Sequence, residues 1–552
     1  MPVTALRRPS PDDALAIRAR EIAIRLTEWP SVTGTRDEAA FALRLAGFLR
    51  SLPCFEGRPD DVVVAPIPGD PLGRANVLAV ARGRGTDAVV LAGHFDTVGI
   101  DDYGDLAPLA CSPEALRDAI VARLEATGEH AQALEDLRSG AFLPGRGLLD
   151  MKAGIAAGIA ALEAFAADPG RRGNVVLVAT PDEEDRSAGM RAAADLLPGF
   201  LAEQGLTARL GVNLDATQDE GDGAQGRVVT FGCVGKLLLS ALVVGKESHA
   251  AYPLKGVNAG YLAAEIVSRV ELAPELVDVS EGQPAAPPTV LIARDLKDAY
   301  NVTLPHAVWL SWNVLVHARK GVEVMEVAEA LVREAGERAC ETMRLRQARA
   351  PSVPMTDAWR RLAVHRFAEV LETALERRPG FADEYKALAE DLSTRHELDL
   401  PTRSRRLVEA AWAASGLEGP AVVLCFGSMP YPAVHWPPEA AGVRAAIEAA
   451  MAQTQGRHGL SIGALPYFPA IADMSFVGPV DGADLAAVAA DTPIWGSSIR
   501  WDLERGATPG IPFVNIGPWG RDYHHWLERL DEAYCFGVLP HLLAAVLDKV
   551  LD

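Results

Sequence analysis

Apolar and polar positions alternate in blocks along the first part of the chain. Four short apolar runs have the length and composition of buried strands, at 77–83, 88–93, 174–180 and 210–216. Between two of these runs, an alanine-rich stretch at 150–168 predicts a helix. Two stretches nearer the N-terminus, 11–29 and 36–52, have helical periodicity. Alternating strands and helices predict an α/β domain with helices on both faces of its sheet.

The pattern changes near Val228. Strand-like and helical stretches then alternate as in a small inserted α+β unit, at 228–246, 258–271, 306–318 and 322–344. The next segment, 354–416, is helical and highly charged, and it predicts an appended helical layer on the insert.

Strand-like sequence at 421–426 and 512–517 and a helix near 438–454 restore the α/β pattern toward the C-terminus. We therefore expect one catalytic domain that is split by an insertion. The expected divisions are a catalytic domain of residues 1–228 and 417–552, an inserted α+β domain of 229–353, and an appended helical segment of 354–416.

Length and composition agree with a multidomain protein that stays in water. A chain of 552 residues exceeds what one hydrophobic core usually supports. Hydrophobic residues make up 49% of it, yet no uninterrupted apolar segment is long enough to cross a bilayer. The N-terminal sequence has no apolar region of the kind found in secretory signals. We expect a cytoplasmic protein without a membrane partner.

Charge and cysteine content exclude further classes. A formal charge of −21 at pH 7 would repel nucleic acid, so we expect no nucleic-acid partner. The six cysteines lie far apart and form no CxxC pair. Their spacing argues against a disulfide framework and against a thiolate zinc site.

Polar residues that follow the apolar runs are the candidates for chemistry, because ligands of open α/β sheets collect at the carboxyl ends of strands. Acids and imidazoles stand at these places: His94, Asp96, Asp150, Asp182, Glu183, Glu184 and Asp215, with His524 and His525 near the C-terminus. Carboxylates and imidazoles together suit zinc, manganese or cobalt, whereas an all-oxygen set would suit magnesium or calcium. A site this acidic could hold two ions bridged by one carboxylate.

Each residue also has an ordinary structural explanation. A single histidine after a strand is mostly structural, and an aspartate at a helix start, such as Asp150, is mostly an N-cap. The pair Glu183 and Glu184 on a loop is ordinarily just solvated. All of these residues would have to follow strands by coincidence, however, so the combination favours a metal site.

The same segments resemble a known family. The similarity lies in GHFDTV, GRGLLDMKAGIAAGIAAL, TPDEEDRSAGM, NLD and a late histidine before a helix. These motifs look like those of the zinc-dependent exopeptidase family of glutamate carboxypeptidase, aminoacylase and succinyl-diaminopimelate desuccinylase. The stretches DLKDAYNVTLP and FGSMPYP look most like its arginine-utilisation branch. The resemblance is weakest in 100–145 and 354–416, and it implies a mixed sheet with an inserted lid domain.

Residue by residue, the resemblance implies two divalent metal ions, zinc with cobalt or manganese as alternatives. His94, Asp150 and Asp215 would hold one ion. Asp150, Glu184 and His524 would hold the other, so that Asp150 bridges both.

Two details of this ligand set follow from the same resemblance. The peptide between Asp150 and Met151 is expected to be cis. A glutamate four residues after the late ligand is typical of the family, and the pair His524 and Glu528 fits this spacing. His525 is the alternative ligand, because both histidines could reach from one turn.

Three residues receive catalytic roles from the resemblance. Glu183 would be the general base that takes a proton from metal-activated water and passes it to the leaving amine. Asp96 would hydrogen-bond the imidazole of His94 and fix its tautomer. In KESHAAYPLKGVNAG, His249 would stabilise the oxyanion, often in a partner subunit's site, which implies a homodimer through the lid. The alternative is that His249 is a lid-surface residue.

Substrate binding is less well specified. Arg294, Asn301, Arg500 and Arg521 are candidates for binding a substrate carboxylate, but spacing does not choose among them. The stretch WLSWNVLV lacks the basic residue common in the family's lid strand, and 354–416 has no counterpart in the small members. Both departures leave the specificity and the dimer geometry open.

We therefore expect a hydrolase that cleaves an amide bond of an N-acyl amino acid or a short peptide in arginine or amino-acid catabolism. One alternative is a non-hydrolytic metabolite-binding protein on the same scaffold, and another is an aminopeptidase. The complete ligand set with its base argues against the first. The lid histidine motif and the inserted domain argue against the second.

Overall fold

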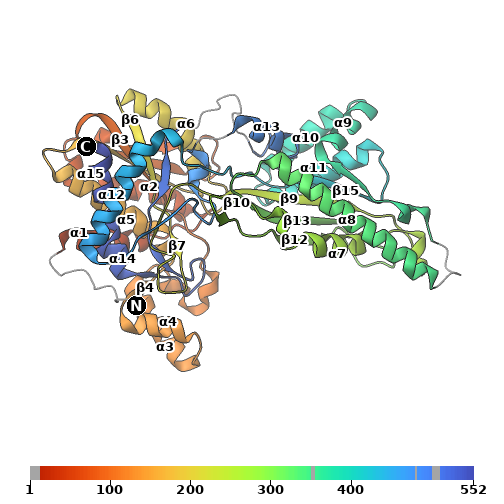
Figure 1. The fold of residues 1–552 in the computed structure, drawn as a ribbon, viewed down its shortest axis with the longest axis horizontal. Helices are drawn as coiled ribbons and strands as arrows, with labels where there is room; N and C mark the ends of the chain where they lie inside the picture. The colour runs from red at the N-terminus through yellow and green to blue at the C-terminus, as the bar shows by residue number, and fades with distance from the viewer. Residues whose placement is uncertain (1–12, 350–354, 479–480, 500–509) are drawn as a thin grey trace. The chain divides into compact units, whose positions relative to one another are not determined.

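The computed structural model describes residues 13–349, 355–478, 481–499 and 510–552. These residues form two compact units, each with its own sheet and hydrophobic core (Figure 1). The first unit comprises the described parts of Met1–Cys233, Val434–Pro479 and Ala507–Asp552. The second comprises those of Val234–Ala433 and Val480–Gly506.

The first unit is built on an eight-stranded sheet. Its strands are, in sheet order, β1 (Val62–Pro66), β2 (Ala75–Arg82), β5 (Arg172–Thr180), β3 (Arg84–His94), β6 (Thr207–Asn213), β17 (Phe513–Asn515), β8 (Val228–Thr230) and β16 (Gly463–Leu465). The strands β5, β3, β6 and β17 run parallel, whereas β1 and β5 are antiparallel to β2. The predicted mixed α/β fold is confirmed.

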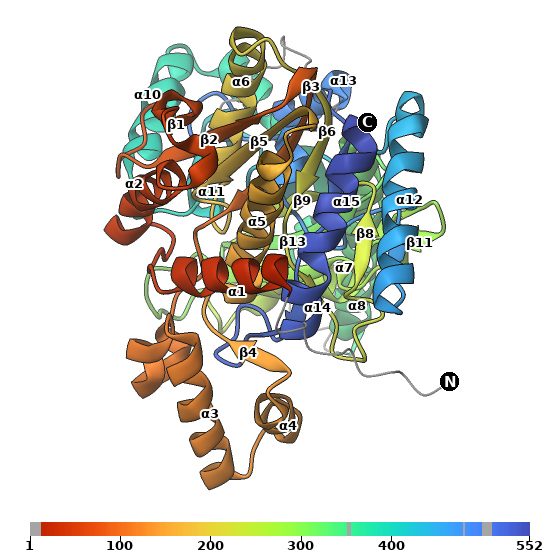
Figure 2. The same cartoon turned by 90° about the vertical axis from the view of Figure 1, so that its left-hand side faces the viewer.

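Helices cover both faces of this sheet. Alternate residues of the central strands, among them Val77, Leu91 and Leu177, belong to one core cluster with several helices. Helices of this cluster include α1 (Ala14–Thr27), α2 (Arg36–Arg50), α5 (Ala153–Ala167), α12 (Ala441–His458), α14 (Glu532–Gly537) and α15 (Leu539–Leu551). Figure 2 shows α5 and α15 lying over the sheet, with α1 next to α5. On the other face, α6 (Ala188–Glu203) contacts β2, β5 and β6 through buried side chains outside this cluster.

The two late histidines, His524 and His525, lie on a turn between two strands of a four-stranded sheet in the same unit. Its strands are, in order, β4 (Phe142–Pro144), β19 (Arg529–Asp531), β18 (Trp519–Arg521) and β7 (Thr217–Gln218). The antiparallel pair β18 and β19 flanks the turn that carries His524. Two helices from the segment of weakest family resemblance contact β4, namely α3 (Pro113–Thr127) and α4 (Ala131–Ser139).

The C-terminal helical stretch is the most hydrophobic long element. Glu532–Leu551 is the single stretch among the described residues that is long and apolar enough to cross a membrane. In the structure 72% of its apolar window is buried, and α15 packs against α5, α12 and β3. Its composition is therefore explained by a place in the core.

The second unit contains a five-stranded sheet with helices on both faces. Its strands are, in order, β12 (Thr289–Asp295), β13 (Ala307–Val316), β9 (Gly235–Val244), β15 (Ala421–Phe426) and β14 (Ala363–Arg366). One face packs against α7 (Ala259–Val270) and α8 (Gly321–Ala348). The other face packs against α9 (Phe367–Arg377) and α11 (Leu400–Ser415). Its other α-helices and strands among the described residues are α10 (Phe381–Thr394), α13 (Gly482–Ala490) and the pair β10 (Val279–Ser280) and β11 (Gln283–Pro284).

The boundaries of the units differ from the expected ones. The chain re-enters the first unit at Val434 rather than at 417, because β15 pairs with β9 and β14 in the second unit. The segment 354–416 supplies β14 and the helices over the second face of that sheet. Every residue of β15 is buried, so its apolar sequence suits the centre of either sheet, and only tertiary pairing decides between them.

Close packing of α5 generates a prediction. A methyl group on Gly154 would lie 2.0 Å from the carbonyl oxygen of Leu214, next to Asp215. We expect Gly154→Ala to lower the stability of the first unit by about 1–3 kcal/mol through overpacking, measured as a lower Tm by calorimetry. Gly47 in α2 has open space around the same position, so Gly47→Ala should raise stability by about 0.5–1 kcal/mol. Equal effects of the two substitutions would contradict this packing argument.

Candidate metal centre

Side chains from three strand ends and one turn meet at one edge of the first unit's sheet. His94 ends β3, Asp215 follows β6, and Glu183 follows β5. Asp150 lies in η4 (Leu148–Lys152), the irregular turn that leads into α5. Because β3, β5 and β6 are parallel, their carboxyl ends open on the same edge. The expected convergence of these residues is therefore present in the structure.

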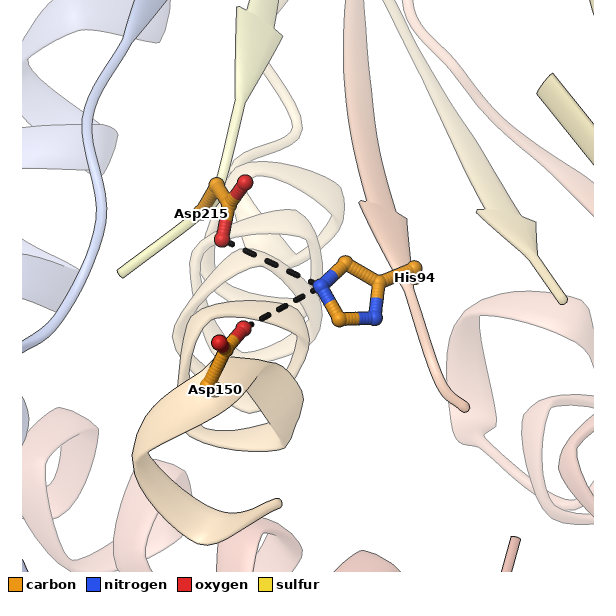
Figure 3. Close-up of side chains that lie close together, drawn as sticks. All are labelled: His94, Asp150 and Asp215. Carbon is orange, nitrogen blue, oxygen red and sulfur yellow. Dashed lines mark hydrogen bonds and ion pairs between the residues drawn. The ribbon is translucent and has the colours of Figure 1, made fainter. Parts of the chain in front are cut away.

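One group consists of His94, Asp150 and Asp215. The Nε2 atom of His94 lies 3.2 Å from Oδ1 of Asp150 and 3.9 Å from Oδ1 of Asp215. Figure 3 shows the imidazole directed toward both carboxylates. One ligand atom from each residue lies within 4.8 Å of the others, so a single cation could contact all three.

A second group consists of Asp150, Glu184 and His524. The Nε2 atom of His524 lies 3.0 Å from Oδ2 of Asp150 and 3.1 Å from Oε2 of Glu184. These ligand atoms also lie within 4.8 Å of one another. Asp150 thus faces one imidazole with each of its oxygens, as a bridging carboxylate would. The predicted cis peptide between Asp150 and Met151 is confirmed.

The structure directs His524, and not His525, toward the acidic residues. The Nδ1 atom of His525 accepts a hydrogen bond from the backbone N–H of Leu527 at 3.3 Å. Its ring lies 6.4 Å from that of His130. The two histidines therefore point to different surroundings from one turn.

Buried ion pairs hold this turn in place. Arg521 and Arg529 both donate to the carboxylate of Asp136 in α4, at 2.6–2.8 Å. Glu528 accepts hydrogen bonds from the guanidinium of Arg146 at 2.7 Å and from the N–H of Gly147 at 3.0 Å. The glutamate expected near the late ligand thus joins the His524 turn to the turn that leads to Asp150.

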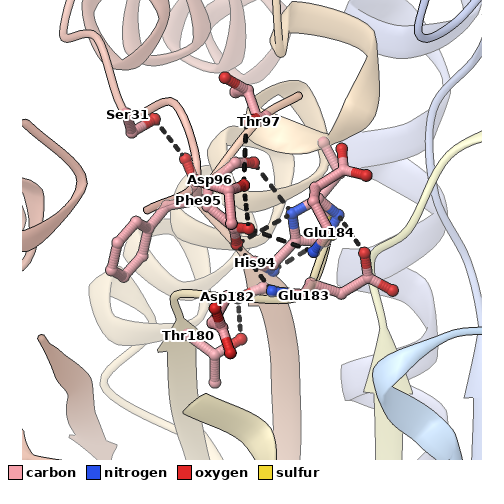
Figure 4. Close-up of polar contacts among 12 residues, drawn as sticks. Ser31, His94, Phe95, Asp96, Thr97, Thr180, Asp182, Glu183 and Glu184 are labelled. Atoms are coloured by element: carbon pink, nitrogen blue, oxygen red, sulfur yellow. Dashed lines mark hydrogen bonds and ion pairs between the residues drawn. The ribbon is translucent and has the colours of Figure 1, made fainter. Parts of the chain in front are cut away.

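Asp96 binds the backbone of the two glutamates. Its Oδ1 accepts from the N–H of Glu183 at 3.1 Å, and its Oδ2 accepts from the N–H of Glu184 at 3.2 Å (Figure 4). The Nδ1 atom of His94 lies 3.1 Å from the backbone oxygen of Asp96 and 3.6 Å from its Oδ1. A hydrogen on Nδ1 is therefore donated to Asp96, which leaves the Nε2 lone pair for a cation. The shorter contact is to the backbone oxygen rather than to the predicted carboxylate.

The electrostatics of the site favour bound cations. Burial by itself lowers the pKa of His94, but hydrogen bonds to Asp150 and Asp215 raise it well above its ordinary value. For His524, burial is likewise outweighed by contacts with Asp150, and the pKa rises to about 11. Burial raises the pKa of Glu183 far above its ordinary value. Negative charge is thus in excess, and divalent ions would balance it by displacing the imidazole protons. The donor set fits such ions.

The other predicted residues belong to the second unit, are already paired, or lie outside the described residues. His249, Arg294 and Asn301 are exposed residues of the second unit. The Nδ1 atom of His249 accepts from the N–H of Ala251 at 3.1 Å. Arg521 is buried against Asp136, as described above, and Arg500 lies outside the described residues.

Two residues near the site were not predicted from the sequence. Asp473 begins the 3-10 helix η9 (Asp473–Phe476), is 2% exposed, and accepts a hydrogen bond from Thr180 at 2.9 Å. Burial raises its pKa to about 7. The apolar residues before it, ALPYFPAIA at 464–472, are interrupted by two prolines and lack the pattern of one continuous strand, so the strand-end criterion missed it. An acid inside the apolar stretch IADMSF was the available signal.

Tyr523 is the second unpredicted residue. Its ring contacts that of His524 edge-on, with centroids 5.1 Å apart. Burial, followed by the charges of Asp150 and Asp215, raises the pKa of its hydroxyl. Its position beside a predicted ligand was the only sequence signal.

Comparisons with known proteins agree with this geometry. The protein called YqjN of Bacillus subtilis is 29% identical over 528 residues, which cover 95% of each chain. Protein RocB of the same organism is 29% identical over 540 residues, covering 96% of this chain and 94% of RocB. A succinyl-diaminopimelate desuccinylase of Xanthomonas campestris is 29% identical over 268 residues, covering 46% of this chain and 62% of that enzyme.

A solved structure shows the same fold. The M20 family metallo-carboxypeptidase Sso-CP2 from Sulfolobus solfataricus superposes with a TM-score of 0.51 over 97% of this chain and 99% of that one, at 11% identity. The sequence pattern described as peptidase family M20/M25/M40 matches residues 90–486. This match spans His94, Asp150, the two glutamates and Asp215. The chain therefore belongs to peptidase family M20/M25/M40, whose metallopeptidases and desuccinylases act on amide bonds.

Proposed function

We propose that the protein hydrolyses the amide bond of an N-acyl amino acid or a short peptide, with two divalent ions at the metal centre. The sharing of Asp150 between two ligand groups is the observation that carries this proposal. Zinc suits the carboxylate and imidazole donors, with cobalt or manganese as alternatives. Two ions bound there would acidify a water molecule and polarise the substrate carbonyl.

Glu183 is the base in this proposal. Its Oε2 lies 3.9 Å from Nε2 of His94, a member of the first ligand group. It takes the proton of the attacking water and delivers it to the leaving nitrogen. Asp96 fixes the positions of Glu183 and Glu184 by accepting hydrogen bonds from their backbone N–H groups. Its contact with Nδ1 of His94 fixes the tautomer of that imidazole.

The substrate class is inferred from the resemblances. Similarity to RocB along nearly the whole chain, and the stretches typical of the arginine-utilisation branch, support an acylated arginine or a related amino acid. The relatives that are desuccinylases support an acyl group on the amine. In this proposal the enzyme acts in the cytoplasm on a small molecule, and His249 of the second unit contacts the substrate carbonyl in a homodimer formed through that unit.

The role of Glu183 is tested by Glu183→Gln. This change keeps the side-chain size and the backbone contacts with Asp96, but it removes the proton acceptor. We expect kcat to fall by about 10²–10⁴-fold, with both metal ions retained in elemental analysis. Glu184→Gln is the matched control and should lose one ion. Turnover that survives in Glu183→Gln would remove this residue from the mechanism.

The ligand assignment is tested by two neighbouring substitutions. His524→Asn should reduce the bound metal from two ions to one, because Asp150 and Glu184 alone hold the second ion weakly. His525→Asn should leave both ions bound, since its imidazole faces His130 instead. Elemental analysis after dialysis measures the stoichiometry. The reverse result would assign the ligand to His525.

The substrate class is tested with a panel of N-acetyl and N-succinyl derivatives of arginine, ornithine and citrulline, set against dipeptides. We expect release of the free amino acid from an acyl derivative, detected by mass spectrometry. Thermal stabilisation without product would instead favour a metabolite-binding protein. Cleavage restricted to peptides with free N-termini would favour an aminopeptidase.

A further inference from the structure

The loop that carries the two glutamates has an unusual backbone. We call residues 181–187 the acidic loop. Asp182 has a φ of 70°, in the left-handed region that side chains other than glycine rarely adopt. Its carbonyl accepts from the N–H groups of Arg186 at 3.1 Å and Ser187 at 2.5 Å. Such a conformation persists only where the surroundings hold it in place.

A buried arginine provides part of that support. Arg74 is 7% exposed, and its Nη1 donates to Oδ1 of Asp182 at 2.5 Å. The same nitrogen lies 3.1 Å from Oε1 of Glu38. Its Nε and Nη2 donate to Asp70 at 2.9 and 2.8 Å. One guanidinium thus joins the acidic loop to two other segments of the first unit.

The carboxylates around Arg74 are themselves held by backbone groups. The Oδ2 atom of Asp182 accepts from the N–H of Ala188 at 3.0 Å, at the start of α6. The Oε2 atom of Glu38 accepts from the N–H of Gly34 at 2.7 Å. Asp70 accepts from the N–H of Arg74 itself at 2.9 Å. The arginine is therefore fixed at both ends of its side chain.

The acidic loop is thus held from two sides. Asp96 binds the N–H groups of Glu183 and Glu184 next to the metal ligands, whereas Arg74 binds the side chain of Asp182. The hydrogen bonds and ion pairs of Arg74 go to Glu38, Asp70 and Asp182, none of which is a predicted ligand. The planar fork of arginine contacts all three carboxylates at once, which the single ammonium of lysine cannot reproduce.

We propose that Arg74 is a positioning residue that, through Asp182, places Glu184 for the second metal ion and Glu183 for the proton transfer. The inference rests on the proposed function. Loss of Arg74 leaves buried carboxylates without their counter-charge, and the acidic loop then relaxes from its left-handed turn. Partners that orient metal ligands typically change metal affinity by about 10–100-fold when removed.

The proposal is tested by a double-mutant cycle in which the zinc affinity of each variant is measured. Zinc binding to the full chain is measured by competition with a chelator for Arg74→Gln, Asp182→Asn and the double variant. We expect each single variant to bind the second ion about tenfold more weakly, with a matching fall in kcat and little change in KM. Because Arg74 acts through Asp182, the double variant should be no weaker than the singles.

Two further variants separate positioning from folding. Arg74→Lys keeps the charge and should recover part of the zinc affinity that Arg74→Gln loses. If Arg74→Gln fails to fold, the zinc affinities of Arg74→Lys and Asp182→Asn test the proposal instead. Arg403 is a buried arginine of the second unit, so Arg403→Gln should lower Tm without weakening zinc binding. Unchanged zinc affinity in folded Arg74 variants would overturn the proposal. Since zinc affinity needs no substrate, this outcome is distinct from failure of the proposed hydrolysis.

Discussion

Repulsion among carboxylates crowded at one edge of a sheet is the constraint on which the site depends. These groups are the side chains of Asp96, Asp150, Glu183, Glu184 and Asp215, all largely buried. A low-dielectric interior tolerates such charge only when protons, N–H donors or cations balance it. The pKa values of His94 and His524 are raised, so their protonated imidazoles supply positive charge. Divalent ions could supply that charge in place of the imidazole protons. The fold thus buries several carboxylates close together, and bound metal ions would neutralise their charge.

Buried arginines form ion pairs next to three of the segments that carry the candidate ligands. Arg74 holds the acidic loop, Arg146 joins Glu528 behind the turn of Asp150, and Arg521 and Arg529 hold the His524 turn against α4. Each guanidinium balances carboxylates without entering the metal centre. The candidate ligands come from segments distant in the sequence, and these ion pairs fix the backbone of three of those segments, as precise metal geometry would require.

In the second unit, as in the first, helices cover both faces of the sheet. Strands β9 and β15 are almost entirely buried because α7 and α8 lie on one face and α9 and α11 on the other. The segment 354–416 is therefore an integral layer of this unit. Coverage on both sides also explains why β15 reads as a continuous apolar run rather than as an alternating one.

The sequence by itself determined several central elements and the candidate polar residues at strand ends, because hydrophobic periodicity and strand-end acids are local properties. The assignment of these residues as metal ligands came from the family resemblance. The sequence predicted β2, β3, β5 and β6, it placed His94, Glu184 and Asp215 at or just after strand ends, and it placed Asp150 at the start of a helix. Its choice of His524 over His525 rested on the spacing to Glu528 that the family resemblance implies. It could not place β15 in a sheet or find Asp473 and Arg74. Those outcomes depend on which distant segments meet, and only the packing of the tertiary structure decides that.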